Sequence, residues 1–523
     1  MTEIYRTLLK NLFDMFRSFF MYVFIKSYSL WNSGNNYDNF VVVNRNQQYY
    51  METEMIPEGR TKMKKTYPLT AAQNMHYRWI KEYGTQQVSG LSIVAALKAE
   101  LDFGLLKKCI ELEMERYGCM RVRFTKADKD GNVQQYLIKK DHRDIPIKDL
   151  TGMSMKEADD LMQSWAYQTF DGDDIPMCEV YMMKLPEGYR GFFIHMDHRL
   201  IDSCGVMVMT NDIMSLYTHY RFGAEYPADL ADFETVLESD LKKASNEKRF
   251  QKDKKFWDDQ LDAYGEPLYS DIQGPSVLDE ARKKHKNKKL RSADIERKEL
   301  FVAVKDYKLE PEPAKRLMDF CMNHSISMTN LLLLGIRTYL SKQNDGQEDI
   351  SIQNFISRRS TKDEWTSGGS RTIMFPCRTV ISSDTDFISA AYEIQDVQNR
   401  IYMHSNYDPA LIYDEIKKRY NTPDDTTYES CYLTYQPMPV KMDNPFLKNI
   451  PMHAKWFANG AATKKMYLTV SHTEDGGMNF SYHYQTVQLN EKDVELMNYY
   501  LMRILFRGIE QPDMTVGEIM EAV

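Results

Sequence analysis

The order of apolar and polar positions predicts a strand followed closely by a helix at residues 191–217. Residues 191–195 form an apolar, aromatic and β-branched run that is too short for a helix, which is typical of a buried strand. From 205 to 217 apolar residues return at helical spacing. The loop between the two elements holds His198 and Asp202. Asp202 lies where the helix begins, and an Asp carboxylate there accepts free backbone N–H groups of the first turn.

The same kind of reading predicts two halves of similar size, each an α/β unit with a sheet and flanking helices. In the first half we expect a helix from Thr70, helices at 103–117 and 155–170, and strands at 121–125, 133–138 and 179–184. The second half begins with a long charged helical stretch, 230–261, and a basic loop, 279–292. It continues with helices at 312–324, 328–341 and 387–405, and strands at 300–304, 350–356, 372–381, 430–436, 466–472 and 478–484.

Composition places the chain among ordinary globular proteins. Its 523 residues are 43% hydrophobic and 27% charged, enough for more than one domain with a large core. The formal net charge of −8 argues against nucleic acid as a partner. Seven cysteines are scattered without metal-ligand spacing, which indicates reduced thiols in a cytoplasmic protein. We interpret the basic loop as a solvated surface in preference to a phosphate or membrane site.

The first 65 residues differ from the rest of the chain in their pattern of apolar and polar positions. A wide apolar stripe with interspersed charges runs through residues 1–30, and a polar, Asn- and Tyr-rich stretch follows to residue 65. The uncharged part of the stripe is far shorter than the roughly 20 residues that cross a membrane. We expect an amphipathic helix docked on protein and a linker; the alternative is an interfacial helix in peripheral contact with a membrane. The predicted divisions are therefore 1–65, 66–240 and 241–523.

Candidate chemistry gathers around His198. The sequence lacks the glycine-rich nucleotide motifs, the HExxH zinc motif and the GxSxG nucleophile motif. His195, Asp197, His198 and Asp202 are metal-ligand residue types, but their spacing on a strand and turn implies no fixed ligand geometry. We therefore expect no metal site, and His198 as an acid–base residue on a loop.

Six segments in order resemble motifs of the condensation domains of nonribosomal peptide synthetases and their wider CoA-dependent acyltransferase superfamily. His198 and Asp202 match the HxxxD core of HHxxxDG. The other segments, with the motif each resembles, are 68–79 (SxAQ…W), 115–124 (RHExLRTxF), 230–233 followed by Phe256-Trp257 (YxDFAxW and YW), 356–360 followed by 369–378 (SGRP and GxFxNTxPxR), and 404–409 (HQDYPFE). The resemblance covers about residues 66–515.

The resemblance implies an α/β fold of two chloramphenicol-acetyltransferase-like subdomains in a V-shaped pseudo-dimer with a central tunnel. It implies that His198 is the catalytic residue at the tunnel centre and that Asp202 is a structural partner of Arg359. Some positions depart from the motifs. Asp197 replaces the first His, Ser203 replaces the motif Gly although Gly205 follows closely, and Ile373 replaces the Asn of GxFxNT.

The expected activity is acyl transfer from a thioester to an amine or hydroxyl. The donor is an acyl or peptidyl group on the phosphopantetheine of a carrier protein, or on CoA, and no cofactor is bound permanently. His198 accepts or orients the proton of the nucleophile. We expect a free-standing enzyme, because no adenylation or carrier domain is present in the sequence.

Three alternatives remain. A CoA-dependent alcohol or lipid O-acyltransferase uses the same fold. A non-catalytic domain that recruits a partner needs no base at position 198. Epimerisation or heterocyclisation is the third, although a heterocyclising domain is expected to have Asp where His198 stands.

Overall fold

The structure is a computed structural model that describes residues 64–141, 143–437 and 444–523. The helix expected in residues 1–30 and nearly all of the expected linker lie outside the described residues. Within these ranges no helix combines the length and apolar character needed to cross a membrane. All seven cysteines are described, and each is a free thiol.

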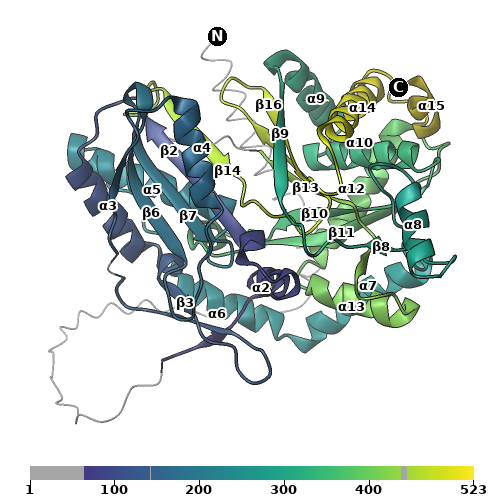
Figure 1. The fold of residues 1–523 in the computed structure, drawn as a ribbon, viewed down its shortest axis with the longest axis horizontal. Coiled ribbons are helices and arrows are strands. Elements are labelled where there is room, and N and C mark those ends of the chain that lie inside the picture. The colour runs from purple at the N-terminus through teal and green to yellow at the C-terminus, as the bar shows by residue number, and fades with distance from the viewer. Residues whose placement is uncertain (1–63, 142, 438–443) are drawn as a thin grey trace, which may run out of the picture. The chain divides into compact units, whose positions relative to one another are not determined.

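The first sheet has five strands and carries the His198 loop at the end of its central strand. The strand order is β14 (Met452–Phe457), β2 (Gly90–Leu97), β7 (Arg190–Asp197), β6 (Cys178–Lys184) and β5 (Ile147–Asp149). All pairs are antiparallel except β5 with β6. β14 comes from late in the chain and lies beside β2, as Figure 1 shows by their contrasting colours.

Helices cover both faces of this sheet, because apolar side chains alternate to the two sides of its strands. Ile194 on β7 packs in the cluster that includes α3 (Phe103–Arg116) and α5 (Ser203–Phe222). Its neighbour Phe193 packs with α4 (Met155–Ala166) on the opposite face.

The second sheet has six strands and holds the larger core. Its order is β11 (Thr372–Val380), β10 (Asp349–Ser357), β13 (Cys431–Gln436), β15 (Met466–His472), β16 (Met478–Gln485) and β9 (Val302–Leu309). The two pairs around β13 are parallel and the others antiparallel. Its core includes α9 (Pro311–Asn323), α10 (Met328–Gln343), α12 (Phe387–Met403) and α14 (Glu491–Glu510).

Smaller elements complete the described chain. Two minor sheets are β1 (Tyr67–Pro68), β4 (Gln134–Leu137) and β3 (Val122–Phe124), and the pair β8 (Ala293–Asp294) with β12 (Thr426–Thr427). The remaining α-helices are α2 (Ala71–Tyr83), α6 (Phe233–Ala244), α7 (Glu247–Tyr264), α8 (Ser276–Lys284), α11 (Lys362–Thr366), α13 (Pro409–Tyr420) and α15 (Val516–Ala522).

The structure refines two expectations about the middle of the chain. The stretch 230–261 is two helices, because Asp232 and Asn246 each accept a first-turn backbone N–H and so begin α6 and α7 separately. The stretch 279–292 is not all loop, because α8 extends into it to Lys284. Leu278 and Ala281 lie on one face of α8 and pack against Tyr269 and Leu290, a spacing that the surrounding lysines obscured.

Candidate active site

The loop between β7 and α5 fixes the backbone of His198. The His198 N–H donates to the Ser89 carbonyl at 2.7 Å, and the Asp197 N–H donates to the Met177 carbonyl at 2.9 Å. Ser89 ends the short 3₁₀ helix that leads into β2. Both neighbours therefore come from the same subdomain, and they hold His198 at the end of the central strand.

His198 is half-buried and its ring stacks on another imidazole. The ring centroids of His198 and His76 are 4.3 Å apart with an interplanar angle of 18°. His198 Nδ1 is buried without a hydrogen-bond partner, and Nε2 forms no hydrogen bond with any described residue. Burial lowers the pKa of His198, against opposing contributions from Asp202, its own backbone and Asp197, so the ring is neutral near pH 7.

His76 is a site residue that the sequence reasoning missed. It lies on α2, three residues after Gln73, so the two side chains share one helix face. The Gln73 side-chain amide donates to the Arg199 carbonyl at 3.2 Å, which ties α2 to the His198 loop. The spacing from Gln73 was a usable signal, but a lone His on a helix offers no reason to expect a ring stack.

Asp202 holds the loop to the second subdomain. Its carboxylate caps α5 and accepts six hydrogen bonds, from the Gly205 N–H, two Arg359 nitrogens, the Arg371 N–H, and the Thr372 N–H and hydroxyl. The nearest Arg359 contact is 2.7 Å. The predicted pairing of Asp202 with Arg359 is present, and the backbone donors of Arg371 and Thr372 were not foreseen.

The charge on Asp202 is permanent at any working pH. Burial alone raises its pKa, but Arg359 and the backbone donors outweigh burial and leave the pKa far below its ordinary value. Burial likewise disfavours the charge of Arg359, and Asp202 reverses this, so the pKa of Arg359 is raised. A carboxylate that stays ionised and saturated with donors is suited to holding structure and unsuited to moving a proton.

Asp197, which stands in place of the first motif His, forms a second buried ion pair. Its carboxylate accepts from Arg199 Nη2 at 2.8 Å and from Arg199 Nε at 3.0 Å, and it also accepts from the Gln86 side chain at 2.8 Å. Asp197 is fully buried. Its place in the site is therefore to brace the turn on both sides of His198.

Ser203 and Gly205 lie in the first turn of α5. Ser203 is the first residue of the helix after its cap, Asp202. At Gly205 a Cβ would lie 2.5 Å from Ile201 Cγ1 and 3.3 Å from the Tyr117 hydroxyl, which donates to the Gly205 carbonyl. The close approach explains a glycine at 205.

The second subdomain reaches the site through β10 and β11. Ile373 is fully buried on β11 and is paired with Ile356 of β10. Just before β11, Gly368 and Gly369 have φ of +77° and +83°. A Cβ on Gly368 would lie 2.4 Å from Cys119 Sγ. The Gly368 backbone therefore lies closely against the side chains of Cys119 and Tyr117.

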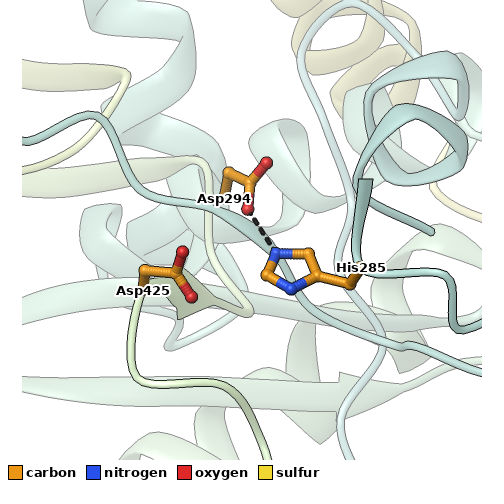
Figure 2. A group of neighbouring side chains, drawn as sticks. All are labelled: His285, Asp294 and Asp425. Atoms are coloured by element: carbon orange, nitrogen blue, oxygen red, sulfur yellow. Dashed lines mark hydrogen bonds and ion pairs between the residues drawn. The ribbon is translucent and has the colours of Figure 1, made fainter. Parts of the chain in front are cut away.

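The four residues considered as metal ligands do not converge. His195 turns away, with Nδ1 2.8 Å from the Ser92 hydroxyl and Nε2 3.0 Å from the Gln168 carbonyl. In the part of the chain that the structure describes, the group that does bring metal-ligand atoms together is His285, Asp294 and Asp425, shown in Figure 2.

The carboxylate of Asp294 in the His285 group already has protein partners. His285 Nε2 is 2.7 Å from one oxygen of Asp294, and Lys284 Nζ is 3.0 Å from the other. The Asp425 carbonyl accepts the Ile295 N–H at 2.8 Å. These contacts fasten α8 to the small β8–β12 sheet, an arrangement that explains the cluster without a metal.

The family model for the condensation domain matches residues 63–521. The chain belongs to the condensation-domain family. A plipastatin synthase subunit of Bacillus subtilis (strain 168) is 20% identical over 458 residues, covering 87% of this chain and 17% of that protein. Surfactin synthase subunit 1 of the same organism is 21% identical over 465 residues, covering 87% of this chain and 12% of that protein. The chain thus spans less than a fifth of either relative's length.

Solved condensation domains have the same fold. The first condensation domain of the calcium-dependent antibiotic synthetase, solved with a substrate analogue, gives a TM-score of 0.69 at 14% identity, covering 87% of this chain and 98% of that one. A starter condensation domain of rhizomide synthetase in complex with C8-CoA gives 0.70 at 14% identity, covering 86% and 96%. The predicted α/β fold of two chloramphenicol-acetyltransferase-like subdomains is confirmed.

Proposed function

We propose that this condensation domain is an acyltransferase that moves an acyl group from a carrier-protein or CoA thioester to an amine or hydroxyl. The observation that carries the proposal is the neutral His198 ring, held by the β7–α5 loop with Nε2 unpaired among the described residues. A neutral imidazole with a free nitrogen is what a general base requires.

In the proposed mechanism His198 Nε2 accepts the proton of the acceptor N–H or O–H. The nucleophile forms a bond to the thioester carbonyl carbon, the C–S bond breaks, and the proton passes from His198 to the departing thiolate. An amide or ester and a free thiol result. The stack on His76 and the ion pairs of Asp202 and Asp197 keep the ring in one place, and positioning of this kind supplies much of the rate in reactions of two substrates.

The proposed thioester donor is supported by the similarity of this chain to known condensation domains. A solved starter condensation domain carries C8-CoA, and the curated relatives are peptide synthase subunits. We propose either an acyl-CoA or the phosphopantetheine arm of a carrier protein as the donor, a small amine or alcohol as the acceptor, and the cytoplasm as the setting. We also retain 66–240 and 241–523 as the proposed subdomain divisions.

The test is an intact-mass assay of candidate acyl-CoAs and acyl-loaded carrier proteins with pooled amines and alcohols. We expect a new product with one donor class, and a loss of about 10²–10⁴ in rate for His198→Ala. The melting temperature of the variant is the control for folding. A His198→Ala protein that melts normally and keeps its rate within a few-fold would exclude the role of base.

The same assay separates the alternatives. Transfer only to alcohols, from CoA donors, indicates the O-acyltransferase. A second comparison tests the lipid O-acyltransferase, with the full chain and a chain that begins at Lys64. If only the full chain binds liposomes and the two melt at the same temperature, residues 1–30 contact the membrane and the lipid O-acyltransferase is supported. Absence of transfer with every donor and acceptor favours the recruiting domain.

A further inference from the structure

Two of the motif-like segments differ from the family strings at positions that touch each other. The segment Ser357-Arg358-Arg359-Ser360 is aligned with SGRP, so Arg358 stands at the glycine. In the segment 404–409, aligned with HQDYPFE, Asn406 stands at the aspartate. Arg358 Nη2 donates to Asn406 Oδ1 at 2.6 Å. This chain therefore gains a positive charge at one position and lacks the negative charge that would neutralise it at the other.

The neighbouring cations each have a carboxylate. Arg371 Nη2 is 2.6 Å from Asp240, Lys243 Nζ is 2.8 Å from Glu364, and Arg249 Nε is 3.8 Å from Asp253. Arg358 forms no ion pair with any residue of the described ranges. Within this group of four cations and three carboxylates, one positive charge is therefore left over, and it is that of Arg358.

The position of Arg358 makes the unpaired charge costly. The side chain is half-buried, and burial lowers the pKa of its guanidinium, with Arg371 and Arg249 adding to that effect and Asp240 and Glu364 opposing it. A guanidinium has five N–H donors in a planar fork that fits carboxylate and phosphate oxygens. An anion at this place would remove the imbalance and take up donors that Asn406 does not use.

Arg358 is also next to the reaction site in the chain. It follows β10 directly, and the next residue, Arg359, holds Asp202 at the start of α5. A group bound by Arg358 would therefore be held by the same strand end that fixes the His198 loop.

We propose that Arg358, with Asn406, binds an anionic group of a substrate, either the phosphate of the pantetheine arm or a carboxylate on the acceptor. The inference rests on the proposed function for the class of molecule that carries the anion. The anion site itself is a property of Arg358 and is tested without acyl transfer.

The first experiment measures binding of matched probes by calorimetry to the full chain. The probes are 4′-phosphopantetheine against pantetheine, and leucine against leucinamide. In parallel, melting is measured in sodium phosphate or sodium acetate against sodium chloride at equal ionic strength. We expect the member that carries the phosphate or the carboxylate to bind about tenfold or more tightly in one of the pairs, since hydrogen bonds between charged groups are the strong ones. We expect phosphate or acetate to raise the melting temperature.

Two variants act on the charge in different ways. Arg358→Gly restores the family residue, and Asn406→Asp places a carboxylate beside the guanidinium. Both are expected to abolish the preference for the probe with the phosphate or carboxylate and the anion-specific rise in melting temperature, whereas Arg358→Lys keeps part of each. Arg316→Gln, at a surface arginine paired with Glu510, is the control for net charge and leaves both unchanged.

The outcomes distinguish a donor anion from an acceptor anion, and they test the anion site separately from the proposed acyl transfer. A preference within the pantetheine pair assigns the anion to the donor, and a preference within the leucine pair assigns it to the acceptor. Equal binding within both pairs, with no salt-specific change in melting, overturns the anion site. An Arg358-dependent anion effect in a protein that shows no acyl transfer keeps the site and rejects the proposed function.

Discussion

The His198 imidazole lies against the His76 imidazole with 4.3 Å between ring centroids, and neither ring nitrogen of His76 has a hydrogen-bond partner. His76 is 2% exposed, and burial, followed by the repulsion that a protonated His198 would exert, lowers the pKa of His76 well below the usual value. Both rings are thus neutral near pH 7. The plane of the proposed base is set by an aromatic contact and not by a carboxylate at Nδ1.

The stack predicts opposite results for two substitutions of His76. His76→Phe keeps an aromatic face and removes two buried unpaired nitrogens, so we expect unfolding free energy to rise by about 1 kcal/mol and activity to stay within a few-fold. His76→Ala removes the face and leaves a cavity. We expect a loss of about 2–4 kcal/mol and a fall in kcat of about 10-fold or more, with KM less affected. Chemical denaturation and steady-state kinetics measure both, and equal activity of the two variants would contradict a positioning role.

The pKa of His198 predicts the pH dependence of the reaction. Because burial lowers this pKa, the neutral, proton-accepting form predominates down to a pH below 6.5. We expect kcat/KM to rise with pH along an acid limb centred below 6.5 and to be flat through pH 7–8. The limb should be absent from the residual rate of His198→Ala. A limb centred above pH 7 would assign the titration to another group.

The buried pair of Asp202 and Arg359 predicts a stability effect larger than that of His198. Both side chains are almost wholly inaccessible, at 1% and 0% exposure. Asp202→Asn leaves Arg359 without its counter-charge, and breaking such a pair costs about 3–5 kcal/mol. Urea denaturation at pH 7 is expected to rank the variants as wild type, then His198→Ala, then Asp202→Asn. Equal midpoints for wild type and Asp202→Asn would contradict the ranking.

The same pair predicts how stability changes in acid. The pKa of Asp202 is depressed in the folded protein, so its contribution is complete above the unfolded value of about 3.9 and is lost as pH falls from there toward the folded pKa. We expect the stability gap between wild type and Asp202→Asn to be constant from pH 7 to pH 5 and to shrink below about pH 4. Denaturation series at these pH values measure the gap. A gap that widens in acid would contradict a depressed pKa of Asp202 in the folded protein.

The glycine pair at the subdomain contact predicts a sharp steric effect. Gly368 has positive φ, and a Cβ there would lie 2.4 Å from Cys119 Sγ and 2.7 Å from Tyr117 Cζ. We expect Gly368→Ala to destabilise by about 2–4 kcal/mol, from backbone strain and overpacking. Gly346→Ala is the matched control, because Gly346 has a φ of +78° and nothing lies within 4 Å of its added Cβ. Similar melting of the two variants would show that the contact gives way.

The sequence predicted local elements well where periodicity was strong. The strand at β7, the helices α3, α10 and α12, and the cap of α5 by Asp202 all appear. It missed β2 and β14, whose patterns carry no clear alternation, and whose pairing joins residues far apart in the chain. It also ran α6 and α7 together, because charged helical residues continue across the break.

For the site, the residues supplied by motifs were found and those supplied by packing were not. His198, Asp202 and Arg359 follow from the family strings. His76 and the backbone donors of Arg371 and Thr372 come from separate segments that the fold brings together, and local sequence carries no signal for such contacts. Arg358 lay unremarked within the SGRP-like segment, and its unpaired charge becomes evident only from its contact with Asn406.

The place of β14 has a consequence for any attempt to use the first subdomain alone. β14 forms the outer edge of the first sheet, next to β2, whose last six residues are buried. A chain cut near residue 240 lacks β14 and would expose the unpaired N–H and C=O groups of β2 along an apolar strand. Such an edge recruits strands from other molecules. The fragment should therefore self-associate, and a chimera that exchanges second subdomains must find a partner whose own strand fits this edge.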